Sequence, residues 1–202
     1  TVIAAANPLR SLSNDARSVT DLLNSIKNPV VLVGHSYGGP VITEAAKGNS
    51  KVKSLVFVAA IAPEKGESVH DVLGKFPGSN LPGNLAPPVE LSDGNKDLYI
   101  LQDRFHDQVA ADVQRAGTDL AASNQRPITA AALNDPATEA TWKHIPSWFV
   151  YGDQDKAIPP AALAASAERA HSKKTIVVKG ASHAVMISNP KIVAQLIEKA
   201  AE

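Results

Sequence analysis

Two short runs dominated by apolar, β-branched residues constrain the fold of this chain most. Val30–Val33 and Val52–Ala60 are rich in valine, leucine and alanine, which is typical of parallel strands buried on both faces. Segments with apolar residues at helical spacing lie beside them, at 14–27 before Pro29 and at 40–47 before Gly48. We expect Ser13 or Asn14 to cap the first of these helices. The alternation predicts an α/β fold in which helices cover a mostly parallel sheet.

The same alternation returns towards the C-terminus. Apolar runs at 147–151 and 175–179 indicate two further strands, and residues 160–170 and 190–201 indicate two helices that begin at proline. In parallel sheets, ligands bind beyond the carboxyl ends of the strands. The turns that follow the predicted strands are therefore the places in which to look for chemistry.

Residues 63–145 interrupt this pattern. Their first part, residues 74–94, is crowded with Gly, Pro, Asn and Ser, and two helical stretches follow at about 103–116 and 128–134. We therefore expect an inserted helical lid at 63–145. The α/β core should comprise residues 1–62 and 146–202.

The composition excludes several classes of protein. Twenty Lys and Arg balance twenty Asp and Glu, which argues against a general nucleic-acid binder. No stretch approaches 18 consecutive apolar residues, so we expect no membrane partner. The absence of cysteine excludes a disulfide framework, a thiolate zinc site and a cysteine nucleophile. It is compatible with every compartment, and our expectation is a cytoplasmic protein.

The turn after the first buried strand carries the clearest chemical motif. Gly34-His35-Ser36-Tyr37-Gly38-Gly39 contains G-x-S-x-G between a predicted strand and a predicted helix, which is the arrangement of a nucleophile elbow. Such a turn holds the serine in a strained conformation, and we expect a Cβ at the neighbouring glycines to clash. The Tyr37 N–H at the start of the helix should donate to a developing oxyanion. The alternative is a tight turn in which Ser36 only caps the helix.

A serine nucleophile needs a base and an acid that orients the base. Of the six histidines, His183 lies just beyond the last predicted strand and follows Ser36 in the chain. Asp153 and Asp155 lie between them in the turn after residues 147–151. With either aspartate, the chain order is serine, acid, histidine, which is the order found in α/β hydrolases. The other aspartate would be an ordinary turn residue.

Three segments together resemble the α/β-hydrolase superfamily: GHSYGG, YGDQDKAIPP and GASHAVMISNP. The resemblance covers essentially the whole chain. It is strongest to the small lid-bearing group that includes plant methyl esterases, hydroxynitrile lyases and bacterial esterase-like proteins. It implies catalytic Ser36, Asp155 and His183, because the family's acid usually follows the strand-ending glycine by three residues. It also implies that no cofactor and no metal are used.

The resemblance further implies a strand and a His-Gly type loop ahead of the first residue, and that loop would supply a second oxyanion N–H. We interpret Thr1–Ala6 as a buried strand. In the family fold, the strand that has no counterpart in this sequence would lie between residues 1–6 and residues 30–34. The expected fold is thus N-terminally truncated by on the order of 40 residues. Residues 1–6 should pair with 30–34, or the place should be taken by further polypeptide or by a strand from another chain, including a second copy.

We expect a small-molecule ester as substrate, hydrolysed through an acyl-enzyme. The predicted substrate contacts are His35, Tyr37, Phe105, His106 and Val185. Phe76 and Trp142 are the other bulky lid candidates for shaping the pocket, and we expect most of the four bulky lid residues to belong to the lid core. Two alternatives remain. One is a hydroxynitrile-lyase-like or perhydrolase-like enzyme on the same triad, for which a lyase would use a lid lysine: Lys75, Lys96 or Lys143. The other is a non-catalytic binding protein that lacks the upstream oxyanion loop.

Overall fold

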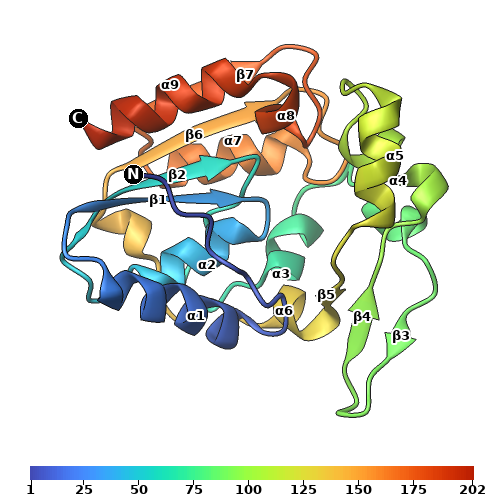
Figure 1. The fold of residues 1–202 in the computed structure, drawn as a ribbon, viewed down its shortest axis with the longest axis horizontal. Coiled ribbons are helices and arrows are strands. Elements are labelled where there is room, and N and C mark those ends of the chain that lie inside the picture. The colour runs from blue at the N-terminus through green and yellow to red at the C-terminus, as the bar shows by residue number, and fades with distance from the viewer.

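Four parallel strands form the central sheet of the computed structural model, which describes all residues 1–202 (Figure 1). The strands lie in the order β1-β2-β6-β7, and every neighbouring pair is parallel. Helices lie on both sides of this sheet, so the predicted α/β fold is confirmed. The strands are β1 (Val30–His35), β2 (Val52–Val58), β6 (Ser147–Gly152) and β7 (Lys174–Val178).

The helices of the core lie close to their predicted places. In Figure 1, α9 lies on one side of the sheet, and α1 and α2 lie on the other. Helix α1 begins two residues earlier than expected, because the hydroxyl of Ser11, not that of Ser13, caps it by accepting the Asn14 N–H. These helices are α1 (Leu12–Ser25), α2 (Gly38–Ala45), α7 (Pro160–Arg169), α8 (Val185–Ser188) and α9 (Pro190–Ala201). None of the helices in the structure has the length and apolar character needed to cross a bilayer.

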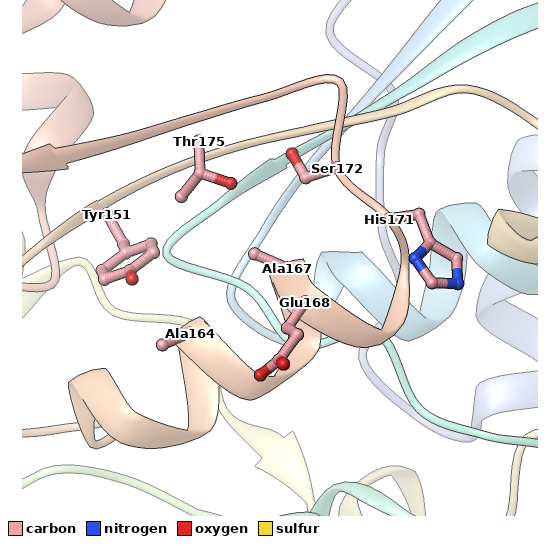
Figure 2. Close-up of a pocket in the computed structure, with 7 residues that line it drawn as sticks. All are labelled: Tyr151, Ala164, Ala167, Glu168, His171, Ser172 and Thr175. Carbon is pink, nitrogen blue, oxygen red and sulfur yellow. The ribbon is translucent and has the colours of Figure 1, made fainter.

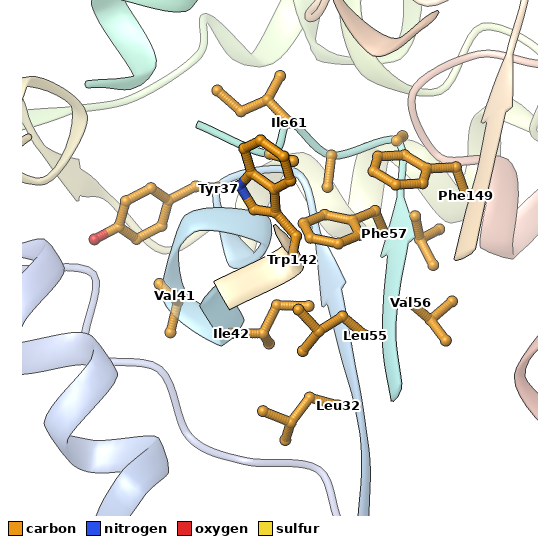
Figure 3. Packing of buried hydrophobic residues seen from close by; sticks show 14 of the residues in the cluster. Leu32, Tyr37, Val41, Ile42, Leu55, Val56, Phe57, Ile61, Trp142 and Phe149 are labelled. Carbon is orange, nitrogen blue, oxygen red and sulfur yellow. The ribbon is translucent and has the colours of Figure 1, made fainter. Parts of the chain in front are cut away.

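The hydrophobic core is centred on β2. Leu55, Val56 and Phe57 of this strand are fully buried, as predicted for a strand covered on both faces. The Phe57 ring stacks on that of Phe149 in β6, with ring centroids 4.5 Å apart and an interplanar angle of 7° (Figure 3). Burial of each such side chain contributes roughly 1.5–3 kcal/mol. The sheet is thus a stable platform for the loops at its carboxyl ends.

The inserted segment between β2 and β6 is only partly helical. It contains a three-stranded antiparallel sheet in the order β3-β4-β5, which the sequence patterns did not predict and which Figure 1 shows beside the helices. These strands are two or three residues long, too short for a recognisable alternation. The elements of the insertion are α3 (Val69–Gly74), η1 (Leu81–Asn84), β3 (Val89–Glu90), β4 (Lys96–Leu98), α4 (Gln102–Val109), α5 (Arg115–Ser123), β5 (Ile128–Thr129), α6 (Ala130–Asn134) and η2 (Thr141–Lys143).

Two predicted lid helices have different bounds in the structure. The helix expected over 103–116 is interrupted, because the chain leaves α4 after Val109 and α5 begins only at Arg115. At the break, the Val109 carbonyl accepts a hydrogen bond from the Ala184 N–H rather than continuing the helix. The segment expected to be helical over 128–134 begins as β5, and the Thr129 hydroxyl then caps α6.

The interpretation of Thr1–Ala6 as a buried strand is wrong. These residues have no regular secondary structure and are exposed, with Val2 97% and Ile3 54% accessible. An extended segment is stable as a strand only when its backbone groups pair with a neighbour, and β1 pairs with β2 alone. Further along the chain, the Arg10 guanidinium binds Asp97 in the lid at 2.6 Å. The expected pairing of residues 1–6 with 30–34 is therefore not formed.

Candidate active site

Ser36 occupies the turn between β1 and α2 in a left-handed backbone conformation, with φ of 56°. Such a conformation costs on the order of 1–3 kcal/mol in a residue other than glycine, and it persists only where the surroundings enforce it. The Ser36 N–H donates to the Val58 carbonyl at 3.1 Å, which ties the turn to the end of β2. The strained turn expected of a nucleophile elbow is therefore present.

The glycines around Ser36 differ in what they permit. A Cβ on Gly34 would lie 2.3 Å from the Gly38 carbonyl oxygen, and one on Gly39 would lie 2.4 Å from the Ile61 oxygen. A Cβ on Gly38 would meet no atom within 4 Å. The expectation that every neighbouring glycine avoids a clash is thus wrong for Gly38. Close packing instead requires Gly34 and Gly39.

The structure brings His183 together with Asp155 and not with Asp153. His183 Nδ1 lies 2.7 Å from Asp155 Oδ2, and both side chains are buried. Asp155 Oδ1 accepts the Ala157 and Ile158 N–H groups at 2.9 Å each, which orients the carboxylate. Because an ionised carboxylate only accepts, Nδ1 of a neutral His183 donates and Nε2 carries the free lone pair.

Asp153 has a different role in the same turn. Its Oδ1 accepts the Gly180 N–H at 2.7 Å and so joins this turn to the loop that carries His183. The two loops also touch backbone to backbone: a Cβ on Gly152 would lie 2.0 Å from the Ala181 carbonyl oxygen. Gln154 N–H donates to that same oxygen at 3.0 Å. These contacts hold the acid and the base at a defined separation.

The lid binds directly to the residues on either side of His183. The Ala184 N–H and the Ser182 hydroxyl both donate to the Val109 carbonyl, at 2.9 and 3.1 Å. Ser182 also hydrogen-bonds Asp112. Although partial burial by itself would raise the pKa of Asp112, the hydrogen bonds from Ser182 hold it below the usual value. Sequence reasoning missed Ser182 and Asp112, whose only signal is that Ser182 adjoins His183.

Two groups at the elbow have no partner in the chain. The Ser36 hydroxyl forms no hydrogen bond, so the expected contact with His183 Nε2 is not closed in this structure. Contacts of this kind often tighten only when a substrate is bound. The Tyr37 N–H likewise meets no acceptor, because regular helical bonding begins further into α2. Both groups are available to a ligand.

Three of the predicted substrate contacts point elsewhere. The Tyr37 side chain packs in the core (Figure 3), and its hydroxyl donates to Asp15 Oδ2 of α1 at 2.9 Å. Burial, together with the negative charge of Asp15, raises the pKa of Tyr37 above its usual range. Val185 is fully buried in the core. His35 faces His183, with its Nε2 3.1 Å from the His183 carbonyl oxygen. Each of these side chains thus has partners within the chain, and its contact with a substrate stays a prediction.

Most of the lid residues singled out in the sequence have partners within the protein. His106 Nδ1 lies 2.9 Å from the Thr118 hydroxyl, which joins α4 to α5, and its neighbour Phe105 is partly buried. Trp142 is buried and donates from Nε1 to the Pro63 carbonyl, and Phe76 packs against the core. The three lid lysines form ion pairs near the surface: Lys75 with Glu67 at 2.5 Å, Lys96 with Glu90 at 2.9 Å and Lys143 with Glu64 at 2.6 Å.

Two hollows of the molecule lie away from this site. One, of about 420 Å³, lies between α7 and the β6–β7 side of the sheet, and Tyr151, Glu168, His171 and Thr175 are among its lining residues (Figure 2). The other, of about 540 Å³, lies between α1 and the loop 135–138. Neither Ser36 nor His183 lines either hollow. No group of three His, Asp or Glu side chains is arranged to hold a metal ion.

Comparison with known proteins identifies the family. Residues 5–196 match the sequence profile described as the alpha/beta hydrolase family. The chain belongs to the α/β-hydrolase family. Figure 1 agrees with this assignment, because the turn after β1 and the loops after β6 and β7 meet beside the lid of this α/β hydrolase.

Its curated relatives carry hydrolase and esterase names. The chain is 32% identical over 184 residues to the alpha/beta hydrolase nvfD of Aspergillus novofumigatus, covering 85% of this chain and 70% of that protein. It is 27% identical over 207 residues to the putative chloroplastic methylesterase 11 of Arabidopsis thaliana, covering 95% of this chain but only 51% of that protein. The chain thus spans about half the length of that plant relative. These names support the expectation of an esterase-type enzyme.

Solved structures show the same fold. Polyneuridine aldehyde esterase superposes with a TM-score of 0.80 at 17% identity, over 99% of this chain and 86% of that one. The Arabidopsis methylesterase MES16 superposes with a TM-score of 0.75 at 18% identity, over 100% of this chain and 82% of that one. At these identities the likeness concerns the fold, and it confirms the predicted α/β-hydrolase architecture.

Proposed function

We propose that this α/β hydrolase hydrolyses a carboxylic ester through an acyl-enzyme on Ser36. One observation carries the proposal: the buried hydrogen bond between Asp155 and His183. An orienting carboxylate fixes the imidazole tautomer so that Nε2 can take a proton. A hydrolase needs a nucleophile close to this imidazole. Ser36 lies in a strained turn directly after His35, and the His35 ring contacts the ring of His183.

The reaction proceeds in two halves. Ser36 Oγ attacks the ester carbonyl carbon while its proton passes to His183 Nε2, and Asp155 stabilises the imidazolium that forms. The carbonyl oxygen becomes an oxyanion, to which the Tyr37 N–H donates. When the tetrahedral intermediate collapses, the bond to the alkoxy oxygen breaks, and His183 returns its proton to that oxygen. An alcohol leaves, and the acyl group remains on Ser36.

The second half regenerates the enzyme. A water molecule attacks the acyl carbon and gives one proton to His183 Nε2. Collapse of the second intermediate breaks the bond to Ser36 Oγ, and the proton on His183 returns to that oxygen. The product is a carboxylic acid, so the net reaction consumes one ester and one water and yields one acid and one alcohol.

The relatives support a methyl ester as the substrate class, because the plant proteins are named methylesterases. The lid supports hydrolysis over the hydroxynitrile-lyase alternative. Lys75, Lys96 and Lys143 each form an ion pair with a glutamate near the surface, and none of them hydrogen-bonds Ser36 or His183.

The test is covalent labelling combined with turnover. A fluorophosphonate probe should label the wild-type chain at Ser36, and the chain should release methanol from a panel of small methyl esters and p-nitrophenol from p-nitrophenyl acetate. Ser36→Ala should abolish labelling and reduce turnover by several orders of magnitude. Ser172→Ala, a change of the same type outside the site, should behave as wild type. A wild-type chain that is neither labelled nor active would support the non-catalytic alternative.

A further inference from the structure

His35 makes two contacts with the proposed base that no sequence pattern predicted. Its Nε2 lies 3.1 Å from the backbone carbonyl oxygen of His183. Its ring also lies against that of His183, with the centroids 4.6 Å apart and the planes inclined by 47°. His35 is the last residue of β1 and directly precedes Ser36. One side chain therefore joins the strand that ends at the nucleophile to the loop that carries the base.

The chemistry of the first contact fixes the state of His35. A backbone carbonyl oxygen only accepts hydrogen bonds, so Nε2 of His35 must be the donor. In a neutral ring, Nδ1 then carries the lone pair. Burial, and secondarily the charge of His183, lowers the pKa of His35 to about 3, while the Asp155 carboxylate and the hydrogen bond to His183 oppose that shift only in part. His35 is thus a neutral donor at ordinary pH.

Few hydrogen bonds hold the backbone around the His183 carbonyl. The lid binds the neighbours of His183, at the Ala184 N–H and the Ser182 hydroxyl. Asp155 binds the His183 ring at Nδ1. The carbonyl of His183 itself is bound only by His35. Without that bond, the hydrogen bond from the Ala184 N–H to Val109 would be the only one left on the peptide group that joins His183 to Ala184. The ring of His183 would then shift relative to Ser36.

We propose that His35 is a positioning residue that holds His183 at the distance and angle needed to take the proton from Ser36. The inference rests on the proposed function and extends it by one residue. The neutral ring also suits its place beside His183, because a second cation there would oppose the imidazolium that forms during each half of the reaction. In this role His35 acts through His183 and not directly on the substrate or on the transferred proton.

Three variants separate the parts of this role. His35→Phe keeps a ring against His183 but removes the donor, His35→Gln keeps an amide N–H that can reach the same carbonyl, and His70→Phe on the exposed part of α3 is the control. Displacement of a catalytic group by about 1 Å can cost on the order of 100-fold in rate. We therefore expect kcat of His35→Phe to fall by about 10- to 100-fold with KM nearly unchanged. Fluorophosphonate labelling should slow in parallel.

The conservative variant and a spectroscopic measurement decide the interpretation. His35→Gln should recover most of the lost kcat, and His70→Phe should equal wild type. The proton NMR signal of His183 Nδ1–H should be sharp in wild type and His35→Gln but exchange-broadened in His35→Phe. Wild-type kcat together with a sharp Nδ1–H signal in folded His35→Phe would overturn the proposal. So would equal losses in the Phe and Gln variants, which indicate a general packing effect.

The NMR arm also separates this inference from the proposed function. If the wild-type chain hydrolyses no ester and binds no probe, the esterase proposal fails. Even then, the Nδ1–H signal still shows whether His35 orders His183. If instead His35→Phe does not fold, His35→Gln is compared with wild type. Loss of the His183 Nδ1–H signal in folded His35→Gln, together with an unchanged kcat, would contradict the proposed coupling between the order of His183 and turnover.

Discussion

Asp153 and Asp155 stand two residues apart in one turn, yet their carboxylates have different partners. Asp155 binds the His183 imidazole, whereas Asp153 binds the Gly180 N–H. In Asp155→Asn, an amide oxygen can still accept the two backbone N–H groups, but its NH2 would then face His183 Nδ1 and favour the wrong tautomer. We expect kcat to fall by about 10³- to 10⁴-fold, as for comparable triads.

The matched control for this change is Asp153→Asn. Its amide oxygen can accept the Gly180 N–H as the carboxylate does. Because this hydrogen bond is kept, although its acceptor becomes neutral, kcat should stay within about threefold of wild type. Both variants should be measured for p-nitrophenyl acetate turnover and for thermal stability. A large loss in Asp153→Asn with little loss in Asp155→Asn would transfer the role of the acid to Asp153.

The pKa of His35 predicts how stability changes with pH. Burial, followed by the charge of His183, lowers this pKa from 6.5 to about 3 in the folded state. Between these values the unfolded chain binds a proton that the folded chain does not. The contribution of the neutral His35 to the free energy of unfolding is therefore fully present above pH 6.5, and it is lost as the pH falls towards 3.

Removing the imidazole should weaken that pH dependence. Between pH 7 and pH 4.5, wild type should lose about 2–3 kcal/mol more of its free energy of unfolding than His35→Phe does. Urea unfolding of both proteins at the two pH values measures the difference, and contributions from all other groups largely cancel in the comparison. An equal loss in the two proteins would show that His35 titrates normally in the folded state.

At the scale of elements, the junction of β1 and α2 depends on two close approaches. Ala at Gly34 would collide with the Gly38 carbonyl, and Ala at Gly39 would collide with the Ile61 carbonyl, whereas Ala at Gly38 meets open space. Because backbone atoms cannot move aside easily, Gly34→Ala and Gly39→Ala should lose several kcal/mol of stability or fail to fold. Gly38→Ala should keep or slightly raise the melting temperature, because alanine favours the helix.

Thermal melts of the three variants test this ranking. The G-x-S-x-G motif includes Gly38 but not Gly39, so the melts compare what the motif requires with what the packing requires. A marked drop in the melting temperature of Gly38→Ala would contradict the packing argument. If Gly38→Ala folds normally but loses esterase turnover, the open space above Gly38 is used by the substrate rather than by the fold.

At the scale of the whole molecule, the two edges of the central sheet differ. The edge strand β7 is accompanied by exposed Lys173, Lys174 and Lys179, charges that discourage pairing with another chain. The other edge strand, β1, begins with four apolar residues, and its Val33 is 42% accessible. No residue of this chain pairs with the outer side of β1.

We therefore expect the 202-residue chain to associate with itself through β1 as its concentration rises. Val33→Lys should reduce that association, and Val177→Lys on the edge strand β7, which is also exposed, is the matched control that should not. Light scattering coupled to size-exclusion chromatography over a range of concentrations measures the effect. A chain that remains monomeric throughout would show that the outer side of β1 does not pair.

Much of this protein follows from local sequence alone. The apolar runs at Val30–Val33 and Val52–Ala60, the helix signals around them and the G-x-S-x-G turn predict the α/β core and the place of Ser36. They do so because a continuous apolar run and a turn between two glycines are patterns of neighbouring residues. The sequence likewise places Ser36, an aspartate and His183 in the turns after three of the predicted strands.

Other features were decided only when distant segments met. Residues 1–6 have the composition of a strand but no partner, since pairing is a property of two segments. The carbonyl of Val109, at the end of the lid helix, is satisfied by the Ala184 N–H, far along the chain. The same holds for the side chain of His35, which points to the backbone of His183. Local patterns specify which element a residue belongs to, and tertiary packing alone determines what each polar group of that element meets.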